Sequence, residues 1–132
     1  MTELTAVYRR ELLSFLQYVR QAPPYAGRAD GPTVAKLRGM ADEELAALEA
    51  LGEYLDRARV TLPHVGAFPT AFTNYNFIAL RKVLPLLRED QAKGLAQLEQ
   101  DAAGLSVPDR AEVEKLVALK RRHLTELEAL AV

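Results

Sequence analysis

The stretch from residue 40 to residue 55 has the repeat of an amphipathic helix, with one acidic residue inside its apolar face. At about 100° per residue, the apolar side chains of this stretch and its flanks fall on one stripe, namely Leu37, Met40, Leu48, Leu51, Leu55 and Ala58. Glu44 lies in the middle of that stripe, one heptad after Leu37 and one before Leu51. A carboxylate that faces a core is strongly unfavourable unless a partner compensates it. A neighbouring element must therefore supply a partner for Glu44.

Composition limits the class of protein without indicating an activity. The chain has 132 residues, 49% hydrophobic and 27% charged, which predicts a single folded domain over residues 1–132. Seventeen basic and eighteen acidic residues leave a net charge of −1, a balance not typical of proteins that bind nucleic acid or acidic membranes. The absence of cysteine excludes disulfides and thiol chemistry. Without a signal peptide or an apolar run of about 20 residues, a cytoplasmic location is expected.

Four stretches with helical periodicity are separated by residues that stop helices. The predicted helices span about 3–21, 33–60, 77–104 and 108–131. A break or kink is expected at Pro85, inside the third helix. In the first helix, Arg10 and Gln17 are expected on the polar face. Strand-like alternation is absent from the sequence, so the predicted fold class is all-α, a four-helix bundle.

The connector between the second and third predicted helices, residues 61–76, is unusually long and has little periodicity. A helix of about 26 residues is about 40 Å long, and 12 or more extended residues can cover that distance. This connector is therefore predicted to return along the whole bundle as a crossover, which makes the second and third helices parallel. Its aromatic residues are expected to hold it against the helices, and they are Phe68, Phe72, Tyr75 and Phe77. His64 is expected at the surface.

Each predicted helix carries one polar residue within its apolar face. These residues are Glu11, Glu44, Gln91 and His123, and Lys120 lies on the flank of the fourth helix. Counted from the turns, the polar residues of the first two helices lie at matching heights, and so do those of the last two. If each pair forms an antiparallel hairpin, all of them can lie in a single layer. The sequence thus predicts one buried polar cluster of Glu11, Glu44, Gln91, Lys120 and His123.

This arrangement resembles the ferritin-like superfamily, in particular rubrerythrin-like four-helix bundles with a long crossover between the second and third helices. The resemblance covers nearly the whole chain, because it rests on topology and register. The di-iron site of that family takes a Glu from each of two helices and a Glu-x-x-His motif from each of the other two. On this resemblance, Glu11 matches the Glu of the first helix, Glu44 the Glu of the second-helix motif, and His123 the His of the fourth-helix motif.

Three positions depart from the family's pattern. Ala47 stands in place of the second-helix His, Gln91 in place of the third-helix Glu, and Lys120 in place of the fourth-helix Glu. Two irons need about four carboxylates, and the matching positions supply two. Lys120 adds a positive charge where a metal ion would lie, so a Lys–Glu pair can satisfy the carboxylates without metal. The sequence favours a polar cluster made of protein groups alone, with no cofactor.

Two functions from different classes remain open. The first is a non-catalytic ferritin-like protein that acts as a homo-oligomer or through a protein partner, with neither nucleic acid nor membrane involved. The second is a metal-binding protein or metal-dependent oxidoreductase that binds iron, manganese or zinc with Glu11, Glu44 and His123. Bound metal that disappears in Glu44→Ala and His123→Ala variants would distinguish the second function from the first.

Overall fold

The computed structural model describes residues 3–76 and 78–130. Its five α-helices are α1 (Leu4–Leu12), α2 (Phe15–Gln21), α3 (Gly31–Arg57), α4 (Leu80–Ala103) and α5 (Val107–Ala129). Two short 3-10 helices, η1 (Arg28–Asp30) and η2 (Thr70–Tyr75), lie in the connectors. No strand is present in the described ranges, which confirms the all-α prediction. The predicted helix ends at residues 77 and 131 lie outside the described residues.

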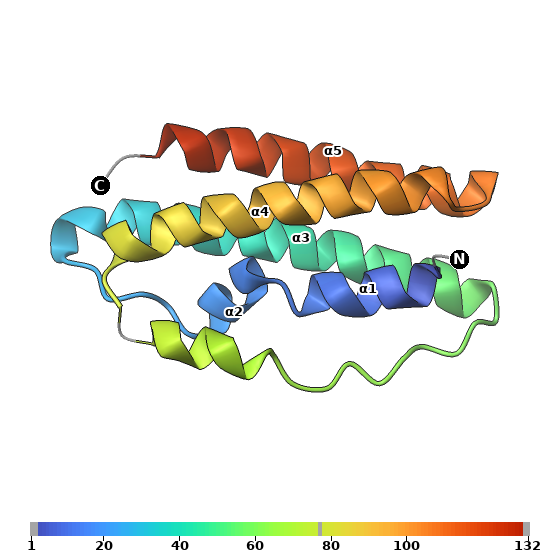
Figure 1. The fold of residues 1–132 in the computed structure, drawn as a ribbon, viewed down its shortest axis with the longest axis horizontal. Coiled ribbons are helices and arrows are strands. Elements are labelled where there is room, and N and C mark those ends of the chain that lie inside the picture. The colour runs from blue at the N-terminus through green and yellow to red at the C-terminus, as the bar shows by residue number, and fades with distance from the viewer. Residues whose placement is uncertain (1–2, 77, 131–132) are drawn as a thin grey trace.

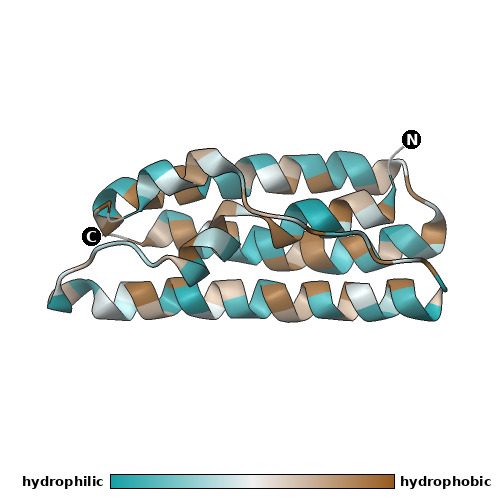
Figure 2. Cartoon of the chain, turned by 90° about the horizontal axis from the view of Figure 1, so that it is seen from below, coloured by the Kyte–Doolittle hydropathy of each residue, from teal (hydrophilic) through white to brown (hydrophobic). Residues whose placement is uncertain are grey.

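The three long helices lie side by side along the long axis of the molecule, and α1 and α2 follow one another beside them (Figure 1). Helices α3 and α4 begin at the same end, whereas α5 runs back in the opposite direction. The connector over residues 58–79 returns along the length of α3, as its length predicts, and Figure 2 shows it in front of the helices. Among the described residues, no helix is both long enough and apolar enough to span a bilayer.

Aromatic rings hold this connector against α2. The ring centroids of Phe72 and Phe15 are 5.0 Å apart, and those of Phe68 and Tyr18 are 5.3 Å apart. Tyr75 also packs against Phe15, with its ring edge towards the other ring. Such tilted and edge-on contacts are the favoured geometries of aromatic pairs. The predicted role of Phe68, Phe72 and Tyr75 is confirmed, and Phe77 lies outside the described part of the chain.

The predicted single helix over residues 3–21 is wrong, because the chain breaks between α1 and α2. Ser14 starts α2, and its Oγ accepts a hydrogen bond of 3.3 Å from the N–H of Gln17. Asp90 of α4 accepts a second bond, of 3.2 Å, from the N–H of Phe15. The first N–H groups of any helix lack partners within the helix. These two side chains supply the missing partners and so stabilise the break.

The break also turns α2 relative to the face expected for a continuous helix. Gln17, predicted on the polar face, is only 4% exposed. Its Nε2 donates a hydrogen bond of 2.8 Å to the carbonyl of Ala41 on α3, which keeps a buried amide paired. The prediction for Gln17 was wrong because the helical repeat was counted through Ser14.

The other helices differ from prediction at their ends. Helix α3 runs over Gly31–Arg57 in place of 33–60. Helix α4 runs over Leu80–Ala103 in place of 77–104, and α5 over Val107–Ala129 in place of 108–131. Helix α4 continues through Pro85 without the expected break. A proline inside a helix leaves the carbonyl four residues earlier without its usual donor. Both Arg81, which carries that carbonyl, and Pro85 are exposed, so water can serve as the donor.

Replacing Ser14 with alanine is expected to lower the free energy of unfolding by about 1 kcal/mol, because α2 loses its capping oxygen. Urea denaturation followed by circular dichroism measures the change. Ser106→Ala is the matched control, since Ser106 precedes α5 without a side-chain capping bond. Equal losses in the two variants would show that Ser14 does not stabilise the break.

The buried apolar side chains form two separate groups. The first lies among α1, the second half of α3, the second half of α4 and the start of α5, and it includes Val7, Leu51, Leu98 and Leu116. The second lies among α2, the first halves of α3 and α4 and the end of α5, and it includes Phe15, Leu37, Leu84 and Leu127. On each long helix, buried polar residues fall between the two groups, and one more, Asp101 of α4, lies within the first group. The core is therefore divided by a polar layer.

Candidate functional site

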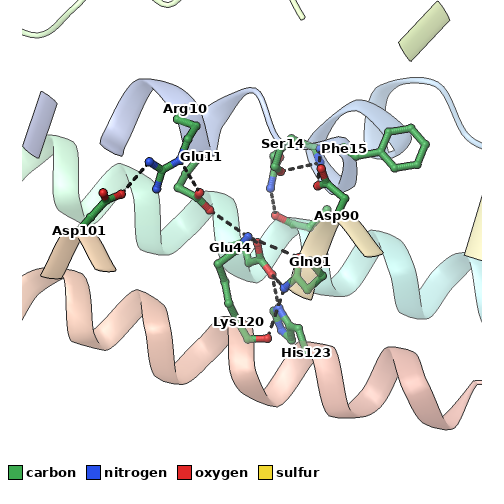
Figure 3. A network of polar contacts seen from close by, with 12 residues as sticks. Arg10, Glu11, Ser14, Phe15, Glu44, Asp90, Gln91, Asp101, Lys120 and His123 are labelled. Carbon is green, nitrogen blue, oxygen red and sulfur yellow. Dashed lines mark hydrogen bonds and ion pairs between the residues drawn. The ribbon is translucent and has the colours of Figure 1, made fainter. Parts of the chain in front are cut away.

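The polar layer contains all five residues predicted from the sequence, which we call the polar cluster: Glu11, Glu44, Gln91, Lys120 and His123. Helices α1, α3 and α4 each contribute one of them, and α5 contributes two (Figure 3). None of the five is more than 4% exposed. Such groups are stable in a core only when they pair with one another.

Lys120 is the centre of the polar cluster. Its Nζ lies 2.8 Å from Oε1 of Glu44 and 2.9 Å from Oε1 of Glu11. The contact with Glu44 is a hydrogen bond, whereas the contact with Glu11 is an ion pair that lacks hydrogen-bond alignment. Oε1 of Gln91 lies 3.4 Å from the same nitrogen. The ammonium group thus bridges two carboxylates from different helices (Figure 3).

Glu44, the residue that interrupts the apolar stripe of α3, has three partners. Its Oε1 accepts a hydrogen bond from Lys120. Its Oε2 lies 2.7 Å from Nδ1 of His123 and also accepts a hydrogen bond of 2.9 Å from Nε2 of Gln91. Burial alone raises the pKa of Glu44, but the hydrogen bond from His123 and the charge of Lys120 outweigh it. The pKa therefore lies below its ordinary value, and Glu44 is ionised at neutral pH.

Lys120 keeps its charge for the complementary reason. Burial by itself lowers the pKa of a lysine, but the carboxylates of Glu11 and Glu44 raise the pKa of Lys120 above its ordinary value. The ammonium is therefore protonated across the neutral range. Because a protonated lysine has no lone pair, it is no nucleophile, and it serves here as a fixed internal cation.

A second set of polar residues, not predicted from the sequence, extends the cluster on the side of α1. Arg10 was expected on a polar face, yet its Nη1 lies 2.7 Å from Oδ2 of Asp101, and its Nε lies 3.4 Å from Oε2 of Glu11. Asp101 is only 5% exposed, and Nε2 of Gln97 donates to its other oxygen at 3.0 Å. Asp101 follows Leu98 by three residues on the buried face of α4, so the sequence did contain a signal for it.

The residues of the layer do not fit a di-iron centre. Only Glu11 and Glu44 bring carboxylates into the polar cluster, and one ammonium group touches both of them. Ala47, which the ferritin-like resemblance aligns with the second-helix His, packs against the first apolar group. Within the described ranges, no three His, Cys, Asp or Glu side chains are arranged to hold a metal ion, Glu11, Glu44 and His123 included. His64, the other histidine, is exposed in the connector, as predicted.

Comparison with known proteins adds no family to this description. A scan against models of known families found no match, and neither did searches of curated proteins and of solved structures.

Proposed function

We propose that this chain is a ferritin-like four-helix bundle in which the side chain of Lys120 has replaced the metals. In this reading, α1 and α2 together form the first helix of the bundle. The protein then has no catalytic role and acts by contact with other protein chains, either copies of itself or a different partner. The observation that carries the proposal is the position of Lys120 Nζ between Glu11 and Glu44.

The course of the chain supports the ferritin-like part of this proposal. A plain up-down bundle joins successive helices by short turns, whereas the connector over residues 58–79 returns lengthwise and leaves α3 and α4 parallel. The polar cluster draws one residue from each of α1, α3 and α4 and two from α5. Ferritin-like proteins place their metal ligands in the bundle core on facing helices in this way.

The charges of the polar cluster support the metal-free part. A divalent ion among Glu11, Glu44 and His123 must either displace the ammonium of Lys120 or lie beside it, and both are unfavourable in a site closed to water. The protein already provides the positive charge that the carboxylates need. Redox chemistry of a di-iron kind therefore has no place in the layer, which leaves a structural or binding role.

Elemental analysis of untagged protein tests the proposal. We expect well under one metal ion per chain, both as purified and after anaerobic incubation with ferrous iron, because Lys120 occupies the cation position. Light scattering on a sizing column gives the oligomeric state in the same preparation. Iron in a one-to-one or higher ratio that is lost in Glu11→Gln would overturn the proposal. It would favour the metal-dependent alternative.

A further inference from the structure

A cleft of about 160 Å³, which we call the aromatic cleft, lies where the connector meets α2 and α4. Its lining comes from three elements: Phe15 of α2, Phe72 and Tyr75 of η2, and Leu86, Glu89, Asp90 and Lys93 of α4. None of the five residues of the polar cluster lines it. In Figure 3 the ring of Phe15 points away from that cluster, and Asp90 lies beside the start of α2. The aromatic cleft therefore combines three rings with carboxylates.

The three rings form a corner rather than a flat stack. The planes of Phe15 and Tyr75 lie at 64° with centroids 5.4 Å apart, and those of Phe15 and Phe72 lie at 48° with centroids 5.0 Å apart. Phe72 and Tyr75 are three residues apart in η2, so their side chains lie on the same side of that 3-10 helix. Ring faces are the negative part of the aromatic quadrupole, and they attract a cation within about 6 Å of the centroid. Rings set at an angle can therefore act together on one cation.

The charges around the aromatic cleft also favour a cation. Oδ2 of Asp90 accepts a hydrogen bond from the N–H of Phe15. Among the described residues no ammonium or guanidinium group forms an ion pair with Asp90, and Lys93, three residues along α4, pairs with Glu89 at 3.0 Å instead. Burial raises the pKa of Asp90 above its ordinary value, and neither the hydrogen bond from Phe15 nor the charge of Lys120 offsets this effect. A cation in the cleft would supply the missing compensation.

We propose that the aromatic cleft binds a trimethylammonium group, carried by a small molecule or by a methylated lysine of another protein. A primary ammonium needs acceptors for its three N–H groups, whereas a quaternary one has no N–H and needs only ring faces and nearby negative charge. A trimethylammonium group is also smaller than benzene, which a cavity of about 150 Å³ accommodates. The aromatic cleft shares no residue with the polar cluster, so its ligand does not depend on whether that cluster holds metal.

Titration with tetramethylammonium chloride, against sodium chloride at equal ionic strength, tests the aromatic cleft. We expect saturable binding of one ion per chain, with the methyl protons of the ligand shifted upfield in NMR by the surrounding rings. Phe72→Leu and Tyr75→Leu should each weaken binding at least about threefold, because each removes a ring. Phe68→Leu is the matched control, since this ring packs against Tyr18 in the same connector and does not line the cleft.

The role of charge is tested by further variants and by a neutral ligand. Asp90→Asn keeps an oxygen that can accept from Phe15 but removes the charge, and it should weaken binding at least about fivefold. Lys93→Gln should tighten binding severalfold, because it removes a competing cation from the lining. Glu99→Gln, at an exposed position of α4 outside the cleft, should leave binding unchanged. On the parent protein, the carbon analogue of choline, with tert-butyl in place of trimethylammonium, should bind much more weakly than choline.

A last titration distinguishes the two sources of the ligand. A short peptide with one trimethyllysine that binds more tightly than choline, while its unmethylated form does not bind, would identify a protein as the source. Binding of choline that equals or exceeds that of the peptide would identify a small molecule. Equal binding of choline and its neutral analogue would overturn the proposal, as would no binding of any trimethylammonium compound. A loss in Phe68→Leu as large as that in Phe72→Leu would overturn it as well.

Discussion

Lys120→Met is expected to lower the free energy of unfolding by about 3–5 kcal/mol, the cost of leaving buried charges without their partner. The variant keeps the length of the side chain but removes the ammonium that touches Glu11 and Glu44. Both carboxylates remain nearly inaccessible to water, so solvent cannot replace the lost cation. Urea denaturation of the variant and the parent protein measures the loss.

Two comparisons show whether the loss comes from charge. Lys115→Met removes an exposed lysine that pairs with Glu112, and such surface pairs contribute about 0.2–1 kcal/mol. In a Glu11→Gln/Glu44→Gln background, Lys120→Met should cost far less, because no buried negative charge is left behind. An equal cost in both backgrounds would mean that Lys120 stabilises the core by packing rather than by charge.

The loss in Lys120→Met should also depend on pH. The pKa of Glu44 is lowered in the folded protein, so its contribution to stability is complete above the unfolded pKa and is lost as pH falls through the folded pKa. The pKa of Lys120 is raised, so its contribution persists up to its unfolded pKa and is lost as pH rises through the folded one. The difference between parent and variant should therefore be largest near neutral pH and shrink below about pH 4.

A triple variant, Ala47→His with Gln91→Glu and Lys120→Glu, is expected to bind two divalent metal ions per chain. It introduces the ferritin-like ligand at each of the three positions at which this sequence departs from that ligand set. The layer would then hold four carboxylates and two imidazoles, the donor set of the family's di-iron site. Elemental analysis after anaerobic loading with ferrous iron counts the ions.

The same variant should depend on metal for its folding. Four carboxylates in a buried layer repel one another, so the metal-free form is expected to be largely unfolded and to gain helix on loading. Circular dichroism before and after loading measures this gain. Adding Glu11→Gln to the triple variant supplies a control that lacks one carboxylate and should bind less metal. A variant that folds without metal and binds none would show that the ferritin-like register is wrong.

The all-α class and the polar cluster were predictable because both follow from the helical repeat. An acidic residue in the middle of an apolar stripe, such as Glu44, demands a buried partner, and the positions of Gln91, Lys120 and His123 could be counted from the turns. The length of the connector likewise dictated its lengthwise return. Each of these signals is local and strong.

The break between α1 and α2 was missed because apolar residues continue on both sides of it. Ser14 and Gln17 have the Ser-x-x-Gln spacing of a capping box, which is a signal for a helix start. That signal is ambiguous inside a long amphipathic stretch, and the deciding partner, Asp90, lies on α4. The pairing of Arg10 with Asp101 was missed for a related reason, since the two residues are 91 positions apart in the chain.

The division of the core by the polar layer has a consequence for how the helices align. Leucine-rich faces such as those of α3 and α4 are nearly interchangeable from one turn to the next, so a slip of about 5.4 Å would cost little in apolar contact alone. With the layer in place, the same slip carries a charged side chain into one apolar group and separates Lys120 from its carboxylates. The polar layer therefore fixes a single longitudinal register of the helices.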